Sequence, residues 1–281
     1  MTRVCLIGLG RTGTEIARTF LGQRDIKLVA AMGSEHSSKA GKDIGSIVNL
    51  PEIGAKIYRP SQMSYVIENL KPDVFVDFSN YKATLSYVKQ ISASKAGLLI
   101  GTTGFSNTDI LRLRALARKN NSAILYAPNI TVGVNVMMLL SNIAAMILPN
   151  YDFEINEAHH KHKKDSPSGT AIKLADQVEE ALASSGQSTE GSIPIHAIRA
   201  GGIVGKHELI IAGENDKIEI SHESFSRSAF AEGALRGVRF IKGKNGFFEM
   251  QDVVELEKAF TRYFEKRRTA VAKATADSTT A

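Results

Sequence analysis

The chain has 281 residues, of which 43% are hydrophobic and 23% charged, with a net charge of +6 and a single cysteine, Cys5. This length fits one large domain or two ordinary ones, and the composition excludes a wholly disordered chain, a collagen-like repeat and a disulfide scaffold. Lys266, Arg267, Arg268 and Lys273 carry much of the positive excess, so the body has no dense basic stripe of the kind that binds nucleic acid.

Short β-branched runs alternate with amphipathic segments of helical length in the first third of the chain. Strands are predicted at 3–7, 26–31, 73–77, 98–100 and 123–126, and helices at 11–22, 82–95 and 108–119. Such alternation indicates βαβ units, a parallel sheet and right-handed crossovers. Asp77, at the end of a predicted strand, is expected to cap the following helix. The predicted fold class is α/β, beginning with a Rossmann-like dinucleotide-binding domain.

The pattern changes near residue 130. Helices are predicted at 132–148, 168–183 and 228–241, and strands at 151–158, 193–199, 207–212 and 217–222. Consecutive strands joined by polar turns indicate a second, α+β domain with a mixed sheet. We therefore assign 1–130, with a return at about 240–265, to the dinucleotide-binding domain, 131–239 to a substrate-binding and oligomerisation domain, and 266–281 to a flexible tail.

The first residues lack a charged lead followed by a long apolar core, so no signal peptide is expected. The most apolar stretch, 132–148, is interrupted by Asn135, Ser141 and Asn142, which indicates a buried helix rather than a membrane span. A single cysteine is compatible with a reducing compartment. We expect a cytoplasmic protein that binds neither nucleic acid nor membrane.

A glycine motif, GLGRTG at 8–13, follows the first predicted strand and opens the first helix. Gly8 permits the tight turn, and Gly10 lets a pyrophosphate approach the backbone. Gly13 lets the helix pack closely on the strand, and the helix N-terminus offers N–H groups to the anion. An incidental strand–helix turn is the alternative, but the flanking elements favour dinucleotide binding.

The end of the second predicted strand bears on the choice of cofactor. An acidic residue there normally accepts hydrogen bonds from the adenosine ribose, but Gly33 takes this position and Glu35 follows two residues later. Ser34, Lys39 and Lys42 could attract a 2′-phosphate. We therefore expect NADPH or NADH, with a mild preference for NADPH that Glu35 could reverse.

The segment 156–171 gathers three histidines and three lysines before Pro167. Ser168 is predicted to cap a helix whose first turn holds Gly169 and Thr170, where N–H groups bind a carboxylate. Imidazole supplies an acid near neutral pH, and lysine supplies positive charge. The combination predicts a pocket for a small dianion that is protonated while it is reduced.

Two other interpretations of this segment stay open. It could be a solvated basic loop, the usual outcome for an isolated cluster of His and Lys. It could also be a metal site, because His160 and His162 share a face if the chain is extended; the neighbouring lysines disfavour a divalent cation. We assign no metal.

This segment, together with motifs elsewhere in the chain, resembles the dihydrodipicolinate reductases (4-hydroxy-tetrahydrodipicolinate reductases) of lysine and diaminopimelate biosynthesis. The similarity covers about residues 3–256, with the motifs in the family's order. They are EAHHxxKxDxPSGTA at 157–171, VDFS at 76–79, GTTGF at 101–105, APNITVGVN at 127–135, GIVGxH at 202–207, SRxxFAxGAL at 226–235 and GFFEMQDV at 246–253.

The resemblance implies an enzyme that reduces an α,β-unsaturated cyclic imine dicarboxylate, dihydrodipicolinate, to tetrahydrodipicolinate with NADH or NADPH. It also implies a homotetramer built through the sheet of the second domain. His159 would be the proton donor and Lys163 its catalytic partner. The substrate ligands implied are His160, Ser168, Gly169 and Thr170. The cofactor-lining residues implied are Gly8, Leu9, Gly10, Arg11, Thr12, Gly13, Gly33, Ser34, Gly101, Thr102, Thr103, Ala127, Pro128, Asn129 and Ile130.

The chain departs from the family pattern in three places. The glycine turn is one residue shorter than the common G-x-x-G-x-x-G, with Thr12 where Met is usual; the acidic ribose ligand is absent; and Gly202 replaces a usual Asp. The shorter turn motivates an alternative function, a related NAD(P)-dependent imine or diamino-acid oxidoreductase. The pair formed by His159 and Lys163 argues against a cofactor-binding regulatory protein with an inactive site.

Overall fold

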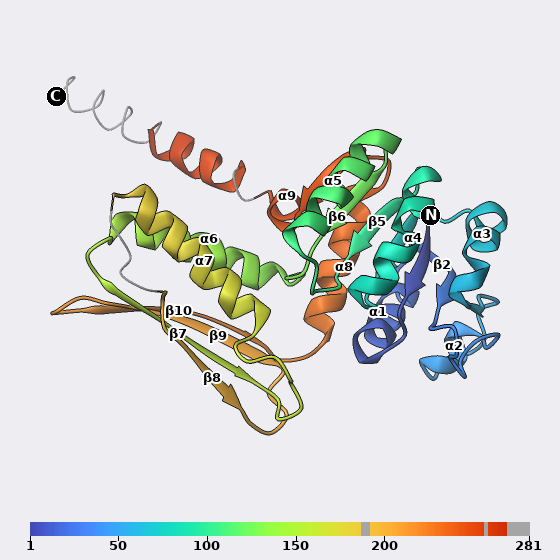
Figure 1. The fold of residues 1–281 in the computed structure, drawn as a ribbon, viewed down its shortest axis with the longest axis horizontal. Coiled ribbons are helices and arrows are strands. Elements are labelled where there is room, and N and C mark those ends of the chain that lie inside the picture. The colour runs from blue at the N-terminus through green and yellow to red at the C-terminus, as the bar shows by residue number, and fades with distance from the viewer. Residues whose placement is uncertain (187–191, 256–257, 269–281) are drawn as a thin grey trace, which may run out of the picture.

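Strands and helices gather into two sheets with helices packed on them (Figure 1). The computed structural model describes residues 1–186, 192–255 and 258–268. The strands in these ranges are β1 (Thr2–Ile7), β2 (Ile26–Met32), β3 (Ile57–Tyr58), β4 (Val74–Asp77), β5 (Gly97–Ile100), β6 (Ala123–Tyr126), β7 (Asp152–His159), β8 (Ile195–Arg199), β9 (Gly205–Ala212), β10 (Lys217–Ser224) and β11 (Gly246–Glu249). The helices are α1 (Arg11–Leu21), α2 (Ile44–Ile47), α3 (Met63–Tyr65), α4 (Tyr81–Ala93), α5 (Asn107–Asn120), α6 (Val132–Ile147), α7 (Gly169–Ser184), α8 (Ser228–Ile241) and α9 (Met250–Val254), with a 3₁₀ turn η1 (Pro60–Gln62), a π-helical turn η2 (Val66–Leu70) and a helix at 258–268.

The first sheet is parallel throughout, with the strand order β11-β6-β5-β4-β1-β2-β3. The chain order reverses between β1 and β4, and ligands of open α/β sheets bind at the carboxyl ends of the strands at such a reversal. The predicted α/β, Rossmann-like fold is confirmed. Of this sheet, β3 and β11 were not predicted: β3 is only two residues long, and β11 is a short edge strand that begins at a glycine.

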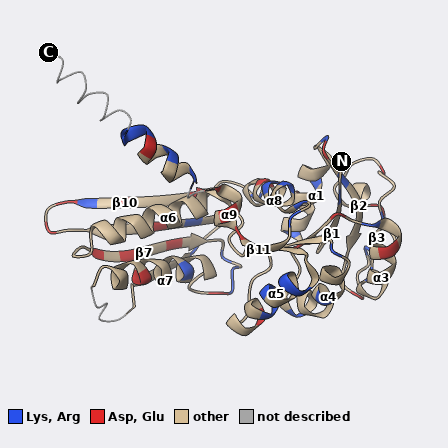
Figure 2. Ribbon diagram, turned by 90° about the horizontal axis from the view of Figure 1, so that it is seen from above, with Lys and Arg blue, Asp and Glu red and all other residues tan. Residues whose placement is uncertain are grey.

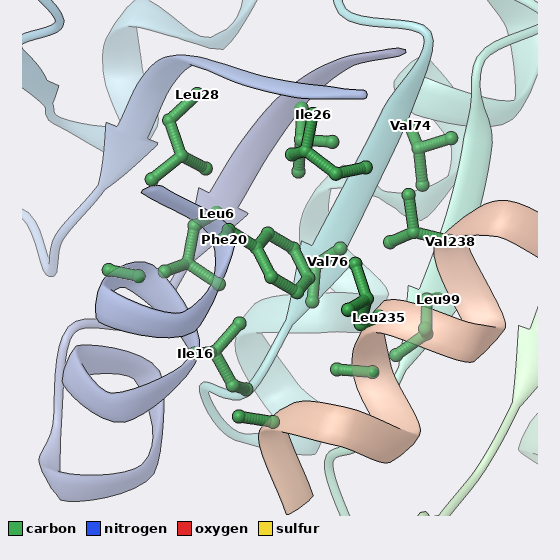
Figure 3. Close-up of a cluster of buried hydrophobic side chains, with 14 of the residues drawn as sticks. Leu6, Ile16, Phe20, Ile26, Leu28, Val74, Val76, Leu99, Leu235 and Val238 are labelled. Atoms are coloured by element: carbon green, nitrogen blue, oxygen red, sulfur yellow. The ribbon is translucent and has the colours of Figure 1, made fainter. Parts of the chain in front are cut away.

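Both faces of this sheet are buried under helices. Neighbouring residues of a strand point to opposite faces, so each strand contributes to both buried clusters. Leu6 and Val76 face the helices α1 and α8, where Phe20 and Leu235 pack over them (Figure 3). Cys5 points to the other face, into the cluster beneath α4 and α5. It is fully buried, and burial raises the pKa of its thiol, so it serves as a small apolar side chain, as predicted.

The second sheet has the order β10-β9-β7-β8. The pairs β10 with β9 and β9 with β7 are antiparallel, whereas β7 and β8 run parallel, so the predicted mixed sheet is confirmed. One face is covered by α6 and α7, whose Met137, Leu174 and Val178 pack on Ile155 and Leu209 of the strands. The apolar segment predicted as a buried helix is therefore α6.

The chain returns to the first sheet earlier than predicted. We expected the second domain to extend to 239, but α8 packs on the first sheet, with Val238 in the same buried cluster as Val76. Gly237 lets α8 lie close to β5, since a Cβ there would lie 2.5 Å from Leu99 Cδ1. After α8, β11 pairs with β6 and so also belongs to the first sheet.

The predicted tail at 266–281 is described only in part. Residues 266–268 form the end of the helix at 258–268, and the others lie outside the described residues. Lys and Arg are spread over both domains and interspersed with acidic residues (Figure 2). Within the described part of the chain, no helix combines the length and apolar character needed to cross a bilayer.

Candidate active site

The segments predicted to line a cofactor all follow carboxyl ends of parallel strands. Residues 8–13 follow β1, 33–34 follow β2, 101–103 follow β5 and 127–130 follow β6. Parallel strands end at one edge of a sheet, so these four segments share that edge. We call them together the carboxyl edge.

The glycine turn has the geometry that a pyrophosphate needs. Gly8 has a φ of +90°, and a Cβ there would lie 2.5 Å from the carbonyl oxygen of Phe78. A Cβ on Gly13 would lie 1.9 Å from the carbonyl oxygen of Gly8, whereas a Cβ on Gly10 would meet nothing within 4 Å. No side chain caps α1 and its first turn holds no acidic residue, so its N–H groups are open to an anion.

Basic side chains surround the pocket at this turn. The pocket has a volume of about 680 Å³ and is lined in part by Gly10, Arg11, Lys39 and Arg227. Lys39 Nζ donates to the carbonyl oxygen of Leu9 at 2.7 Å, which holds its charge beside the glycine turn. These residues fit a phosphorylated cofactor.

Glu35, the acidic residue that could accept from a ribose, is bound elsewhere. Its carboxylate accepts from the amide of Ser61 at 3.2 Å and from the hydroxyl of Ser61 at 2.8 Å. Gly33 holds the position after β2 where the acid would normally stand.

Asp77 lies beneath the carboxyl edge and does not cap α4. The cap is Asn80, whose side chain accepts from the amide of Ala83 at 3.0 Å. The Asp77 carboxylate is fully buried and accepts from the hydroxyls of Thr84 at 2.6 Å and Tyr87 at 2.7 Å. It also accepts from Ser79 at 2.6 Å and from Thr102 at 3.3 Å, and the second bond anchors a residue of the carboxyl edge. The predicted cap is therefore wrong, because the four hydroxyl groups satisfy this carboxylate.

His159 is the last residue of β7 and is 8% exposed. Its Nδ1 lies 2.5 Å from Oε2 of Glu157, which is itself buried. Glu157 also accepts from Arg199 Nη1 at 2.8 Å and Nη2 at 2.6 Å, and from the amide of Ser168 at 3.1 Å. We call Glu157 and these three partners the glutamate network.

Burial and the charges of this network shift the pKa values of Glu157 and His159. Burial alone raises the pKa of Glu157, but the hydrogen bonds from Arg199 and His159 outweigh it, and the pKa lies below its ordinary value. Burial lowers the pKa of His159, the bond to Glu157 raises it, and the charge of Lys163 lowers it, leaving it below its ordinary value. His159 is thus an imidazole that gives up a proton readily.

Ser168 begins α7 and contacts a second buried histidine. Its hydroxyl accepts from the amide of Ala171 at 3.2 Å, which confirms the predicted cap, and lies 3.0 Å from Nε2 of His207. Burial, followed by the charge of His159, lowers the pKa of His207 to about 3. His207 is therefore neutral at ordinary pH.

The loop between β7 and α7 carries the other predicted residues. Lys163 Nζ lies 2.9 Å from the carboxylate of Asp165. Burial raises the pKa of Asp165, but the bond from Lys163 outweighs it and the pKa is lowered. Burial lowers the pKa of His160, and the positive charges of Arg11 and Arg227 lower it further.

The structure joins the two predicted sites directly. The hydroxyl of Thr170, in the first turn of α7, donates to Oδ1 of Asn129 at 2.6 Å. Asn129 belongs to the carboxyl edge, so the predicted carboxylate site and the predicted cofactor site are neighbours. Among the described residues no group of three or more His, Cys, Asp or Glu side chains has the arrangement of a metal site.

The sequence alone predicted no role for Glu157 or Arg199. The spacing of Glu157 and His159 is a usable signal, because residues two apart on a strand share a face. Arg199 has no such signal: it arrives through the parallel pairing of β7 with β8, in which it stands opposite His159.

Both domains match models of one protein family. The model for the N-terminus of dihydrodipicolinate reductase matches residues 2–130, and the model for its C-terminus matches residues 133–254. The 4-hydroxy-tetrahydrodipicolinate reductase of Methanothermobacter thermautotrophicus is 36% identical over 256 residues, which cover 86% of this chain and 94% of that protein. The enzyme of the same name from Polynucleobacter necessarius is 38% identical over 265 residues, 89% of this chain and 97% of that protein.

A solved structure is similar over the same length. The dipicolinate-bound dihydrodipicolinate reductase from Paenisporosarcina sp. TG-14 superposes with a TM-score of 0.73 and 27% identity, over 89% of this chain and 97% of that one. Because the similarity spans both domains in sequence and in structure, the chain belongs to the dihydrodipicolinate reductase family.

Proposed function

We propose that this chain catalyses the NAD(P)H-dependent reduction of 4-hydroxy-tetrahydrodipicolinate or dihydrodipicolinate to tetrahydrodipicolinate, a step of lysine and diaminopimelate biosynthesis. The observation that carries the proposal is the bond between Thr170 and Asn129, which puts the start of α7 against the carboxyl edge. A dicarboxylate held at α7 is then next to a dinucleotide held at that edge. Membership of the family supports the same reaction.

The residues divide the chemistry between binding and proton transfer. The 4-hydroxy compound must first lose its hydroxyl as water to give the conjugated ring, and the reduced nicotinamide, when bound, would supply a hydride to C4 of that ring. The resulting enamine must gain a proton at the adjacent carbon, and His159 would donate it from Nε2, because Glu157 engages Nδ1. Lys163 supplies positive charge beside this proton transfer.

The dicarboxylate is to be held by His160 and by the helix start formed by Ser168, Gly169 and Thr170. The α7 start has no acidic residue in its first turn, and the positive end of a helix dipole attracts a carboxylate. These contacts orient C4 toward the nicotinamide, and orientation of this kind contributes much of the rate of a two-substrate reaction.

We propose NADPH or NADH as the cofactor, with a mild preference for NADPH. The support is that Gly33 takes the position after β2 where an acidic ribose ligand would normally stand, and that Lys39 adds positive charge at the glycine turn. The proposed assembly is a homotetramer formed through the second sheet. Its support, besides the family, is that apolar side chains such as Ile198 and Ile218 are 52% and 43% exposed on that sheet. The proposed location is the cytoplasm.

A coupled spectrophotometric assay tests the reaction. Dihydrodipicolinate synthase generates the substrate, and oxidation of NADPH and of NADH is followed in parallel. We expect oxidation of either cofactor only when the synthase is active. At low cofactor concentrations, turnover should be faster with NADPH than with NADH. Oxidation with other imines or keto acids, together with none from the coupled product, would replace this proposal by the related imine or diamino-acid oxidoreductase.

A further inference from the structure

The buried carboxylate of Glu157 holds both ends of the loop between β7 and α7. The Glu157 side chain accepts from His159 at one end of the loop and from the amide of Ser168 at the other. Two further bonds come from Arg199, which also donates to the carbonyl oxygen of Asp165 at 2.7 Å inside the loop. The side chain of Glu157 is 0% exposed, so no solvent competes for these bonds.

The chemistry of this contact fixes the tautomer of the imidazole. An ionised carboxylate is only an acceptor, so the nitrogen of His159 that meets Glu157 must carry a proton. That nitrogen is Nδ1. The neutral ring therefore has its lone pair on Nε2, and the proton that the charged ring can release sits on Nε2.

The space next to Nε2 is kept open. A Cβ on Gly205, at the start of β9, would lie 3.1 Å from Nε2 of His159. Any other residue at this position would crowd the atom that the carboxylate leaves free. The ring is also held edge-to-face against His207, with 5.1 Å between centroids.

We infer that Glu157 is a positioning residue: it fixes the Nδ1–H tautomer of His159 and ties this acid to the start of α7, where the substrate carboxylates are to bind. The inference rests on the proposed function and deepens it. Loss of the carboxylate would free the ring, reverse its tautomer and loosen the loop at Ser168.

The sign of the pH effect follows from the groups around His159. Glu157 on the same strand is its one negative neighbour among the groups that alter its pKa, and Lys163 and Arg199 oppose protonation. The neutral His207 of β9 lies edge-to-face against the His159 ring, and Asp165 is paired with Lys163. Removing the Glu157 charge lowers the pKa of His159, so the protonated donor is lost at a lower pH.

The test compares Glu157→Gln with Glu154→Gln. Glu154 lies on the same strand and pairs with His196 at 3.0 Å, but its side chain is 53% exposed, so this variant breaks a similar pair outside the site. For Glu157→Gln we expect kcat to fall by about 10²–10⁴-fold, the range for general acid catalysis and for a reversed tautomer. The descending limb of its kcat–pH profile should move at least about one unit to lower pH. Cofactor affinity by fluorescence titration should be unchanged, and Glu154→Gln should match the parent protein.

A Glu157→Gln protein with lower kcat and lower Tm but an unmoved pH limb would overturn the inference, since a merely structural role predicts that result. Nitrogen-15 NMR of the histidines in the unsubstituted protein, assigned with His159→Gln, gives a second test that requires no turnover. We expect neutral His159 to be protonated at Nδ1, and an Nε2–H signal would also overturn the inference. An inactive protein with the Nδ1–H signal would refute the proposed reaction and leave the geometry of the network standing.

Discussion

The Thr170 hydroxyl donates to Oδ1 of Asn129 at 2.6 Å and so joins the first turn of α7, in the second domain, to the loop after β6 in the first. Thr170→Val and Asn129→Ala each remove this bond. Because a neutral hydrogen bond contributes about 0.5–1.5 kcal/mol, each change should lower kcat/KM for the dicarboxylate by about two- to tenfold.

The double variant should lose no more than either single variant, since one bond is removed in all three. Ser184→Ala is the control: it removes a hydroxyl that donates to the carbonyl of Ala181 at the other end of α7, and kcat/KM should not change. Fully additive losses would show that the two side chains act independently.

His159→Gln tests the proton donor directly. We expect kcat to fall by about two orders of magnitude or more, because the ring is the buried acid at the end of β7. The Kd for NADPH should stay close to that of the parent protein. His196→Gln, an exposed histidine on β8, is the matched control. Equal activity in His159→Gln would remove His159 from this role.

The glycine turn allows stability and cofactor binding to be separated. A Cβ on Gly10 meets nothing within 4 Å and the φ there is −77°, so Gly10→Ala should keep its Tm but bind NADPH at least about tenfold more weakly, because the methyl group meets the pyrophosphate. A Cβ on Gly13 would lie 1.9 Å from the Gly8 carbonyl, so Gly13→Ala should lose about 1–3 kcal/mol of stability. Thermal unfolding and a cofactor titration of both variants check this contrast, and a Gly10→Ala protein with unchanged NADPH affinity would contradict it.

Lys39 should discriminate between the two cofactors. Its Nζ is held at the carbonyl of Leu9 and lines the pocket at the turn, whereas Lys42 does not line this pocket. A charged hydrogen bond contributes about 1.5–3 kcal/mol, so Lys39→Gln should raise KM for NADPH at least about tenfold and change KM for NADH much less. Lys42→Gln should have a smaller effect on both. Equal losses for NADPH and NADH would assign Lys39 to the pyrophosphate that both cofactors share.

The first domain could be predicted from the sequence because its signals are local. The short apolar run of β1, the glycines that follow it and the helical spacing of the apolar residues in α1 can be recognised without knowing any distant residue. The packing of α8 on the first sheet was not predicted, because the apolar face of a helix does not reveal in the sequence which sheet it covers. Glu157 and Arg199 were missed for a similar reason, since strand pairing brings together residues 42 positions apart.

His207 makes the stability of the folded protein depend on pH. Its pKa is about 3 in the folded protein, against 6.5 for an ordinary histidine. Between these values the unfolded chain binds a proton that the folded chain does not, so stability falls as pH falls from about 6.5 toward about 3. One such group contributes a slope of at most about 1.4 kcal/mol per pH unit. His207→Gln removes this group, so its unfolding free energy, measured by urea at a series of pH values between about 7 and about 5, should fall less steeply with acid than that of the parent. His196→Gln, which removes an exposed histidine, should keep the parental slope; a His207→Gln protein with that same slope would show that His207 does not carry the effect.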